Sequence, residues 1–189
     1  DETGSPIGSG TIDLRPTSSA TTIEHRYQIG AVTQHIISTV DPHSLRPISG
    51  EQQITGSKND FSLVTTYQSN TLTIKATTAQ GEKDFTISVA PDSIDNDSLL
   101  MALRAFPLAA GYTSSFNTVV GASALQIKST LTVAGKETIT VPAGTFETYK
   151  VTLGFGAGSN QTTWYEVAAP QRLIQYDNGQ NKFVLVKSS

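Results

Sequence analysis

The sequence TITVPAGTFETYKVTL, residues 138–153, decides the fold class. Pro142 fixes its own φ angle and donates no backbone hydrogen bond, and Gly144 accepts a positive φ angle, so the chain must turn there. After the turn, Tyr149 and Val151 alternate with polar residues and therefore share one face of a strand. The stretch predicts a β-hairpin.

The same alternation of apolar and polar residues recurs along most of the chain. Residues 23–29 (IEHRYQI) alternate strictly, which predicts a half-buried strand. Asn178 and Gly179, between two alternating runs, are a strong signal for a tight turn. Counting such runs gives about eleven strands, too many for a flat sheet. We therefore expect an all-β protein, mainly a single highly curved antiparallel sheet that forms an open half-barrel.

One segment departs from this alternation. Residues 98–106 (SLLMALRAF) place good helix formers at helical spacing, and Pro107 prevents the helix from continuing. We expect one short helix on the concave side of the sheet. The acidic residues Asp92, Asp95 and Asp97 are expected to cap this helix and compensate its dipole, since no closing Glu follows for a calcium loop.

The composition bears on domain organisation and compartment. Residues 1–21 hold few large apolar side chains and predict a flexible leader, and residues 22–189 predict a single β domain. Charged residues make up only 15% of the chain, and uncharged polar residues fill the difference. This composition and the Gly/Ser/Pro-rich start favour an exported protein, periplasmic, extracellular or in the cell envelope. Its signal segment would already be removed, and trimming at a convenient boundary explains the same start.

Several function classes lack their sequence signals. A net charge of −3 argues against nucleic-acid binding, and the absence of cysteine excludes thiol catalysis, zinc-thiolate sites and Fe–S clusters. The chain has no apolar stretch of membrane-spanning length and no phosphate-binding or dinucleotide-binding loop. Glu147 and Glu166 are expected on solvated strand faces and not as a glycosidase pair. We expect no cofactor, no catalytic residues and no enzyme.

The histidines are the remaining candidates for a metal site. His25 and His35 lie on neighbouring strands of a hairpin that turns near Gly30, and a turn centred there would place them opposite each other. No third ligand accompanies them, so we expect a half-buried or surface pair and no metal. His43, beside Asp41, is interpreted as a turn residue.

Five segments share their order and spacing with one known family. They are DPHSLRP (41–47), Tyr67 with the short strand pair after it, DNDSLLMALRAFPL (95–108), VPAGTFETYKV (141–151) and the strand from Trp164 to Ile174. Together they resemble the DUF3108-like family of uncharacterised exported bacterial proteins, over roughly Tyr27 to Val186. That family is similar in fold to the periplasmic lipoprotein carriers of the Lol type, whose open β half-barrel holds acyl chains. The resemblance implies a fold more than an activity.

Large aromatic and aliphatic residues on a concave sheet face either fill a core, as is usual, or line a pocket for an apolar ligand. Our first hypothesis is a non-enzymatic exported protein that binds a lipid or other apolar ligand there. The expected lining is Leu99, Leu103, Phe106, Trp164, Tyr149, Tyr67 and Tyr27. The alternative is a structural or protein-interaction module of the cell envelope with a solid core. An enzyme acting on envelope polymer is a third hypothesis without a catalytic set.

Overall fold

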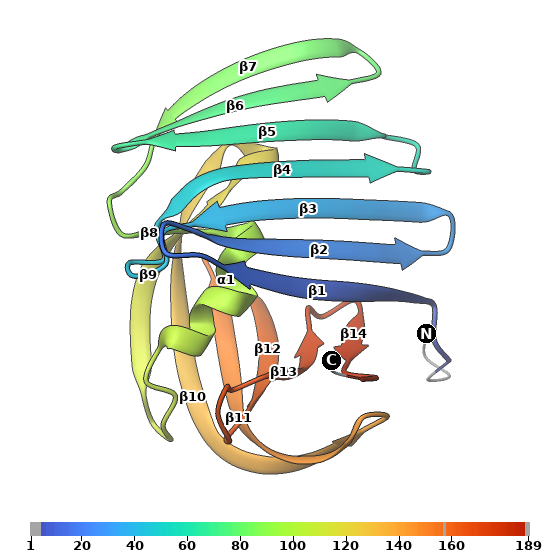
Figure 1. Cartoon of the computed structure of the whole chain (residues 1–189), viewed down its shortest axis with the longest axis vertical. Helices are drawn as coiled ribbons and strands as arrows, with labels where there is room; N and C mark the ends of the chain where they lie inside the picture. The colour runs from blue at the N-terminus through green and yellow to red at the C-terminus, as the bar shows by residue number, and fades with distance from the viewer. Residues whose placement is uncertain (1–4, 157, 188–189) are drawn as a thin grey trace. The chain divides into compact units, whose positions relative to one another are not determined.

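The structure, a computed structural model, describes residues 5–156 and 158–187, apart from the side chain of Ser159. It is mainly β, which confirms the predicted class. The strands form two seven-stranded sheets, however, and not one sheet of about eleven strands. Each sheet is open, with an edge strand on either side (Figure 1).

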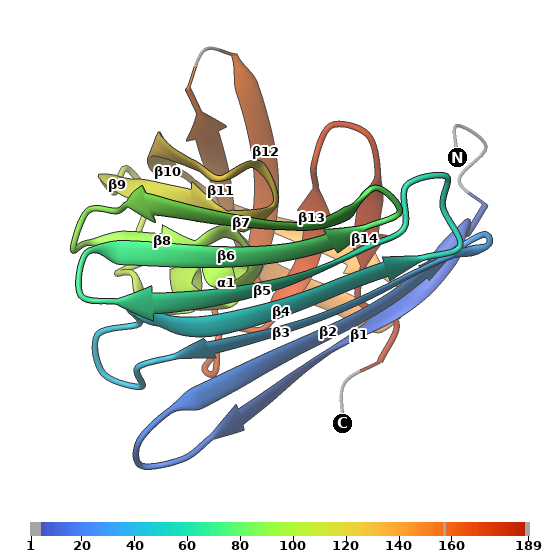
Figure 2. The same cartoon turned by 90° about the horizontal axis from the view of Figure 1, so that it is seen from above.

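The first sheet is an antiparallel meander whose strands neighbour one another in sequence order. Figure 2 shows them side by side. They are β1 (Gly8–Pro16), β2 (Thr21–Ile29), β3 (Val32–Val40), β4 (Pro47–Thr55), β5 (Phe61–Gln68), β6 (Thr71–Thr78) and β7 (Gly81–Ser88). Short loops between consecutive strands give each strand its antiparallel neighbour.

The second sheet has the order β14-β13-β12-β11-β10-β9-β8. Its strands are β8 (Ser93–Asp95), β9 (Thr113–Val120), β10 (Leu125–Val141), β11 (Gly144–Phe155), β12 (Ser159–Glu166), β13 (Leu173–Asp177) and β14 (Lys182–Val184). β8 runs parallel to β9, whereas β10 to β14 pair antiparallel. Figure 1 shows strands β10 and β11 bending strongly.

The helical segment separates the strands of the first sheet from most strands of the second, where a single sheet was predicted. Within the described residues, α1 (Asn96–Ala102) is the one α-helix, and a 3-10 turn, η1 (Leu103–Ala105), extends it. After this segment β9 pairs with β8 and β10 and does not continue the meander at β7. A second 3-10 turn, η2 (Gly121–Ser123), links β9 to β10. In the described part of the chain, no helix is long and apolar enough to cross a membrane.

The chain groups into two compact units. One comprises Asp1–Leu99 and Asn117–Gln126, and the other Leu100–Phe116 and Ile127–Ser189. Residues 22–189, which the sequence predicts to form one domain, contribute to both units.

The predicted leader differs from the structure. Its residues 8–16 form β1, which pairs with β2 along its whole length, and residues 1–4 lie outside the described residues. Gly10 permits this close pairing, because a Cβ atom there would lie 2.4 Å from Cδ1 of Tyr27. The apolar residues Ile12 and Leu14 are few, but they alternate, and the edge of β2 supplies the hydrogen-bond partners that an isolated leader would lack.

The hairpin of residues 138–153 is confirmed. β10 and β11 pair antiparallel up to Val141 and Gly144, which flank the turn, and Gly144 adopts a φ angle of 136°. The register shifts once, between Val133 and Gly135, where Ala134 is the extra residue of a β-bulge. A bulge of this kind increases the local bend of a strand pair.

Candidate functional site

The two histidines of the β2–β3 hairpin point to opposite faces of the first sheet. The hairpin turns over two residues and not on Gly30 alone, so His25 pairs with Ile36 and His35 pairs with Arg26. The expected cross-strand pair of His25 and His35 is therefore wrong, because a shift of one residue moves a side chain to the other face. The described residues contain no group of three or more His, Asp or Glu side chains placed to hold a metal ion.

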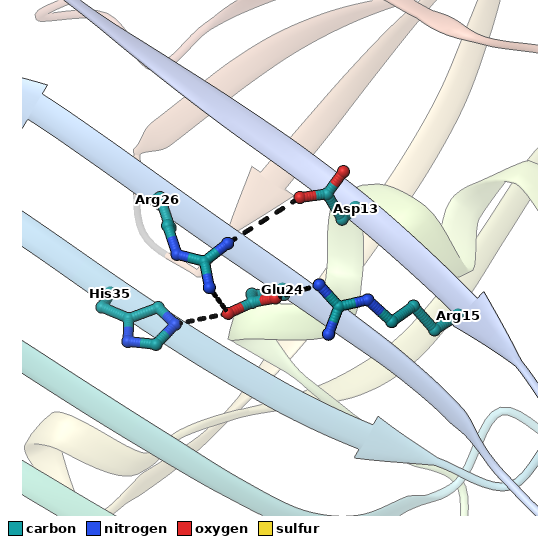
Figure 3. Close-up of polar contacts among 5 residues, drawn as sticks. All are labelled: Asp13, Arg15, Glu24, Arg26 and His35. Carbon is teal, nitrogen blue, oxygen red and sulfur yellow. Dashed lines mark hydrogen bonds and ion pairs between the residues drawn. The ribbon is translucent and has the colours of Figure 1, made fainter. Parts of the chain in front are cut away.

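One face of β1–β3 carries a cluster of charged residues around Glu24 (Figure 3). Arg15 contacts Oε2 of Glu24 at 2.7 Å, and Nε2 of His35 donates to Oε1 at 2.7 Å. Arg26 forms a third ion pair with Glu24 and lies 3.9 Å from Asp13. We call these five residues the Glu24 cluster; they join three strands, and each acidic member faces a basic one.

The Glu24 carboxylate is shielded by its partners. Its side chain is only 4% exposed, whereas those of Arg15 and Arg26 are 63% and 51% exposed. The hydrogen bond from His35, followed by the positive charges of Arg26 and Arg15, holds the pKa of Glu24 below its ordinary value. Because both carboxylate oxygens contact basic side chains, Glu24 stabilises the pairing of β1, β2 and β3 and is not suited to accepting a proton from a substrate.

This arrangement predicts how acid acts on the Glu24 cluster. A carboxyl group whose pKa is lowered by folding stabilises the protein above its unfolded pKa, and this contribution is lost as the pH falls through the folded pKa. We therefore expect Glu24→Gln to lower the melting temperature at pH 7 and to differ little from the wild type at pH 3. Thermal unfolding followed by circular dichroism measures both, with Glu51→Gln, an exposed residue of the same sheet, as control. An equal loss at both pH values would contradict the ion-pair explanation.

The opposite face of the same strands is apolar. We call it the β1–β3 apolar face; its large side chains are Ile12 and Leu14 on β1, Ile23, His25, Tyr27 and Ile29 on β2, and Val32, Ile36 and Val40 on β3, and it also carries the polar residues Thr21, Gln34 and Ser38. Leu14 remains 39% exposed, and Ile12, Tyr27, Ile29 and Val32 are half-buried. These partly exposed apolar side chains follow one another along β1, β2 and β3.

The other end of the same face, over β5–β7, is packed within its own unit. Leu63, Leu72 and Ile74 form a buried cluster with Val89 and Val119. Leu72 and Val119 have no exposed surface. The first sheet thus has a closed core over β5–β7, and over β1–β3 it combines buried residues such as Ile23 and Ile36 with partly exposed ones such as Leu14.

Two polar atoms lie within the β1–β3 apolar face without partners. His25 is 4% exposed and Ser38 is 2% exposed. Nδ1 of His25 lies 2.9 Å from the Tyr27 hydroxyl, but among the described residues Nε2 of His25 and Oγ of Ser38 have no hydrogen-bond partner. Burial lowers the pKa of His25 to about 4, so the ring is neutral at pH 7. An unpaired buried polar group costs about 1–3 kcal/mol, and native structures contain few of them.

Three of the seven expected ligand residues belong to the first unit. Tyr27 lies on the β1–β3 apolar face, beside His25. Tyr67 donates its hydroxyl hydrogen to the Asp95 carboxylate, and Leu99 is 2% exposed. A hollow beside Tyr67 encloses about 10 Å³, which is room for one water molecule. Tyr67 is half-buried and packs against the cluster of Leu63, Leu72 and Ile74, so of these three residues only Tyr27 lies on the β1–β3 apolar face.

The other four expected residues belong to the second unit and do not form one lining. Leu103 is fully buried, and the ring of Phe106 lies 5.6 Å from that of Phe116. Tyr149 and Trp164 are on neighbouring strands but on opposite faces, because Tyr149 pairs with Tyr165. The ammonium groups of Lys136 and Lys150 lie 5.5 Å from the ring centres of Tyr149 and Trp164, respectively. The indole of Trp164 also donates to the Glu137 carboxylate.

The acidic residues before α1 serve local structure. Asp95 caps the helix as predicted, since its Oδ1 accepts from the backbone N–H of Asp97 at 2.8 Å. Asp92 does not cap and instead accepts from Nδ2 of Asn117 at 3.0 Å. Burial, and then the charge of Asp95, raises the pKa of Asp97 to about 7. Burial also raises the pKa of Asp95, and the hydrogen bonds from Tyr67 and from the backbone N–H of Asp97 oppose this rise.

Glu147 and Glu166 are not arranged as a catalytic pair. Glu166 faces Thr148 across β11 and β12, so the adjacent Glu147 points to the other face. Arg172 donates two hydrogen bonds to Glu166, at 2.7 and 2.9 Å. Glu147 is 58% exposed and lies 3.6 Å from Nζ of Lys136. The expectation of a solvated face holds for Glu147, whereas the side chain of Glu166 is 15% exposed.

Solved structures share the fold of this chain. A β-barrel-like protein of the domain of unknown function DUF1849 from Brucella abortus aligns over 93% of this chain and 83% of its own, with a TM-score of 0.62 and 7% identity. A DUF1089 family protein from Pseudomonas aeruginosa aligns over 91% of this chain and 90% of its own, with a TM-score of 0.51 and 11% identity. At such low identity the likeness shows the fold alone.

The family follows from the sequence. The chain belongs to the DUF3108 family of proteins of unknown function, whose model matches residues 3–186. This match confirms the resemblance found in the sequence and includes all of β1, which that resemblance did not cover. No curated protein matches the chain.

Proposed function

We propose that this chain is a non-enzymatic exported protein that binds a lipid or another apolar ligand on the β1–β3 apolar face. The observation that carries the proposal is the partial exposure of Leu14, Ile12, Tyr27 and Ile29 next to one another on that face. Burying such side chains under a hydrocarbon chain contributes about 25 cal/mol per Å² of apolar surface removed from water.

On the opposite face of β1–β3, the charged residues pair with one another and are not placed to contact a ligand on the apolar face. The Glu24 cluster holds its acidic and basic groups together on the opposite face, which leaves the apolar face free of full charges. A binding face without charged groups favours hydrocarbon over a polar substrate. The perturbed acids Asp95 and Asp97 lie at the start of α1, where Asp95 accepts hydrogen bonds from Tyr67 and from the backbone N–H of Asp97, and they form no acid–base–nucleophile set there.

Export is supported by composition and family resemblance. Only 15% of the residues are charged. The face of the first sheet opposite the apolar one is rich in Thr, Ser and Gln on β4–β6, as suits a protein of the periplasm, the cell envelope or the extracellular medium. The alternative function is an interaction module of the cell envelope with no ligand. Its supporting observation is that β1 and β7 are both edge strands, at which another chain could pair.

The proposal is tested by ligand content and by one charged substitution. Native mass spectrometry of protein purified from a bacterial lysate, followed by solvent extraction, is expected to reveal a bound lipid. Long-chain amphiphiles are expected to displace a fluorescent apolar dye. Leu14→Asp is expected to weaken this binding about tenfold or more without unfolding the protein, because Leu14 is partly exposed and a carboxylate there must be desolvated by the ligand.

The matched control for Leu14→Asp is Val64→Asp. Val64 is 46% exposed and lies on the opposite face of the same sheet, so the same charge is added away from the ligand. Equal weakening by both variants would place the ligand elsewhere. Protein that carries no lipid and binds no amphiphile would overturn the proposal and leave the interaction module.

A further inference from the structure

Two unpartnered polar atoms within an apolar face call for a polar group from outside the chain. Ile23 pairs with Ser38 and His25 pairs with Ile36, so His25 and Ser38 are diagonal neighbours on one face. Diagonal neighbours in an antiparallel pair are about 7–8 Å apart, a separation that one small polar group between them can span. Nε2 of His25 and Oγ of Ser38 are the two atoms that lack a partner there.

The surroundings define which polar group fits. The basic residues of these strands, Arg15, Arg26 and His35, all belong to the Glu24 cluster on the opposite face, so they offer no counter-charge to an anionic head group. Nε2 of a neutral imidazole either donates or accepts, according to which ring nitrogen holds the proton, whereas a serine hydroxyl can donate one hydrogen bond and also accept. A ligand hydroxyl, which donates and accepts, matches both, whereas an ionised carboxylate or phosphate would be buried without a cation.

We infer that Nε2 of His25 and Oγ of Ser38 bind the neutral, hydroxyl-bearing head of an amphiphile whose hydrocarbon chain lies along Leu14 and Tyr27. This inference rests on the proposed function and adds the chemical class of the ligand, a long-chain alcohol or an acylglycerol rather than a fatty-acid anion. Tyr27 has a second part in this site, because its hydroxyl lies 2.9 Å from Nδ1 of His25 and orients the ring.

Three ligands of equal chain length test the inference. At pH 8, dodecanol and 1-monododecanoylglycerol present hydroxyl groups, whereas dodecanoate is ionised. Dye displacement from the wild type is expected to show binding of the two hydroxyl ligands about tenfold tighter than that of dodecanoate. Equal affinity for all three ligands would overturn the inference while leaving the proposed function intact, and no binding of any ligand would overturn both.

Variants of the two polar residues give a second, independent readout. Ser38→Ala is expected to weaken dodecanol binding about fivefold, to leave dodecanoate binding unchanged, and to keep or raise the melting temperature of the free protein, since it removes an unpaired atom. Ser62→Ala on the opposite face is the matched control. If Ser38→Ala lowers the melting temperature and leaves dodecanol binding unchanged, the two atoms hold a structural water and the inference is wrong. His25→Phe, an apolar ring of similar size, repeats the test on the second atom.

Discussion

Replacing Tyr165 by alanine is expected to lower the free energy of unfolding by about 3–5 kcal/mol, the range for a large buried aromatic residue. Tyr165 has no exposed surface, and its hydroxyl donates to the carbonyl oxygen of Leu100 at 2.7 Å. Burial raises the pKa of this hydroxyl, so it stays protonated as a donor. The hydrogen bond joins strand β12 to the end of helix α1, so the substitution removes both packing and a helix contact. Urea unfolding measures the loss.

The matched control is Tyr149→Ala, at the residue that pairs with Tyr165 across the sheet. Tyr149 is half-buried, so its removal is expected to cost clearly less. Tyr165→Phe separates the two contributions of Tyr165, since it keeps the ring and leaves the Leu100 carbonyl without its donor, at about 1–3 kcal/mol. Equal losses for Tyr165→Ala and Tyr149→Ala would show that β12 does not hold the helix.

Asp97 is expected to make the protein less stable as the pH rises from 5 to 8. Its pKa is raised to about 7 in the folded protein, so between its unfolded pKa and pH 7 the folded state holds a proton that the unfolded state has released. Stability from this group is therefore complete at low pH and lost as the pH rises through 7. Asp97→Asn is expected to raise the free energy of unfolding at pH 8 by about 1–2 kcal/mol and to change it little at pH 5.

The dependence of the unfolding free energy on pH distinguishes the raised pKa of Asp97 from the mere loss of one negative charge. Asp92→Asn changes an exposed acid of the same segment and is expected to leave the profile unchanged. The pKa of Asp95 is also raised by burial, so Asp97→Asn should reduce the decline between pH 5 and 8 without abolishing it. An undiminished decline in Asp97→Asn would show that the proton is bound elsewhere.

The fold was predictable where local chemistry decides it. Pro142 and Gly144 determine a turn from within four residues, and the hairpin around them formed as expected. The division into two sheets depends on whether β9 pairs with β7 or with β8, which is a choice between distant segments. Alternation within each strand does not record that choice, so the sequence was compatible with a single sheet.

The candidate site was predictable in part. The alternation of residues 23–29 already placed His25 on one face with Ile23 and Tyr27, so a polar residue among apolar ones was visible. Predicting the β2–β3 register one residue away from its true position placed His35 on that face by mistake. In the structure Ile36 pairs with His25, and Ser38 pairs with Ile23 on the same face. In the described part of the chain, Nε2 of His25 lacks a hydrogen-bond partner only because no neighbouring strand supplies one. The alternation within a single strand does not contain this information.

Glu24 and His25 are consecutive residues on β2 that point to opposite faces, one among arginines and the other among apolar side chains. If β2 slipped by one residue against β1 and β3, the carboxylate would enter the apolar face without its arginines, and the imidazole would move into the charged cluster. Both exchanges are unfavourable, and they occur together. This dipeptide therefore fixes the register of β2, and it does so beside β1, an edge strand that has only one neighbouring strand to hold it.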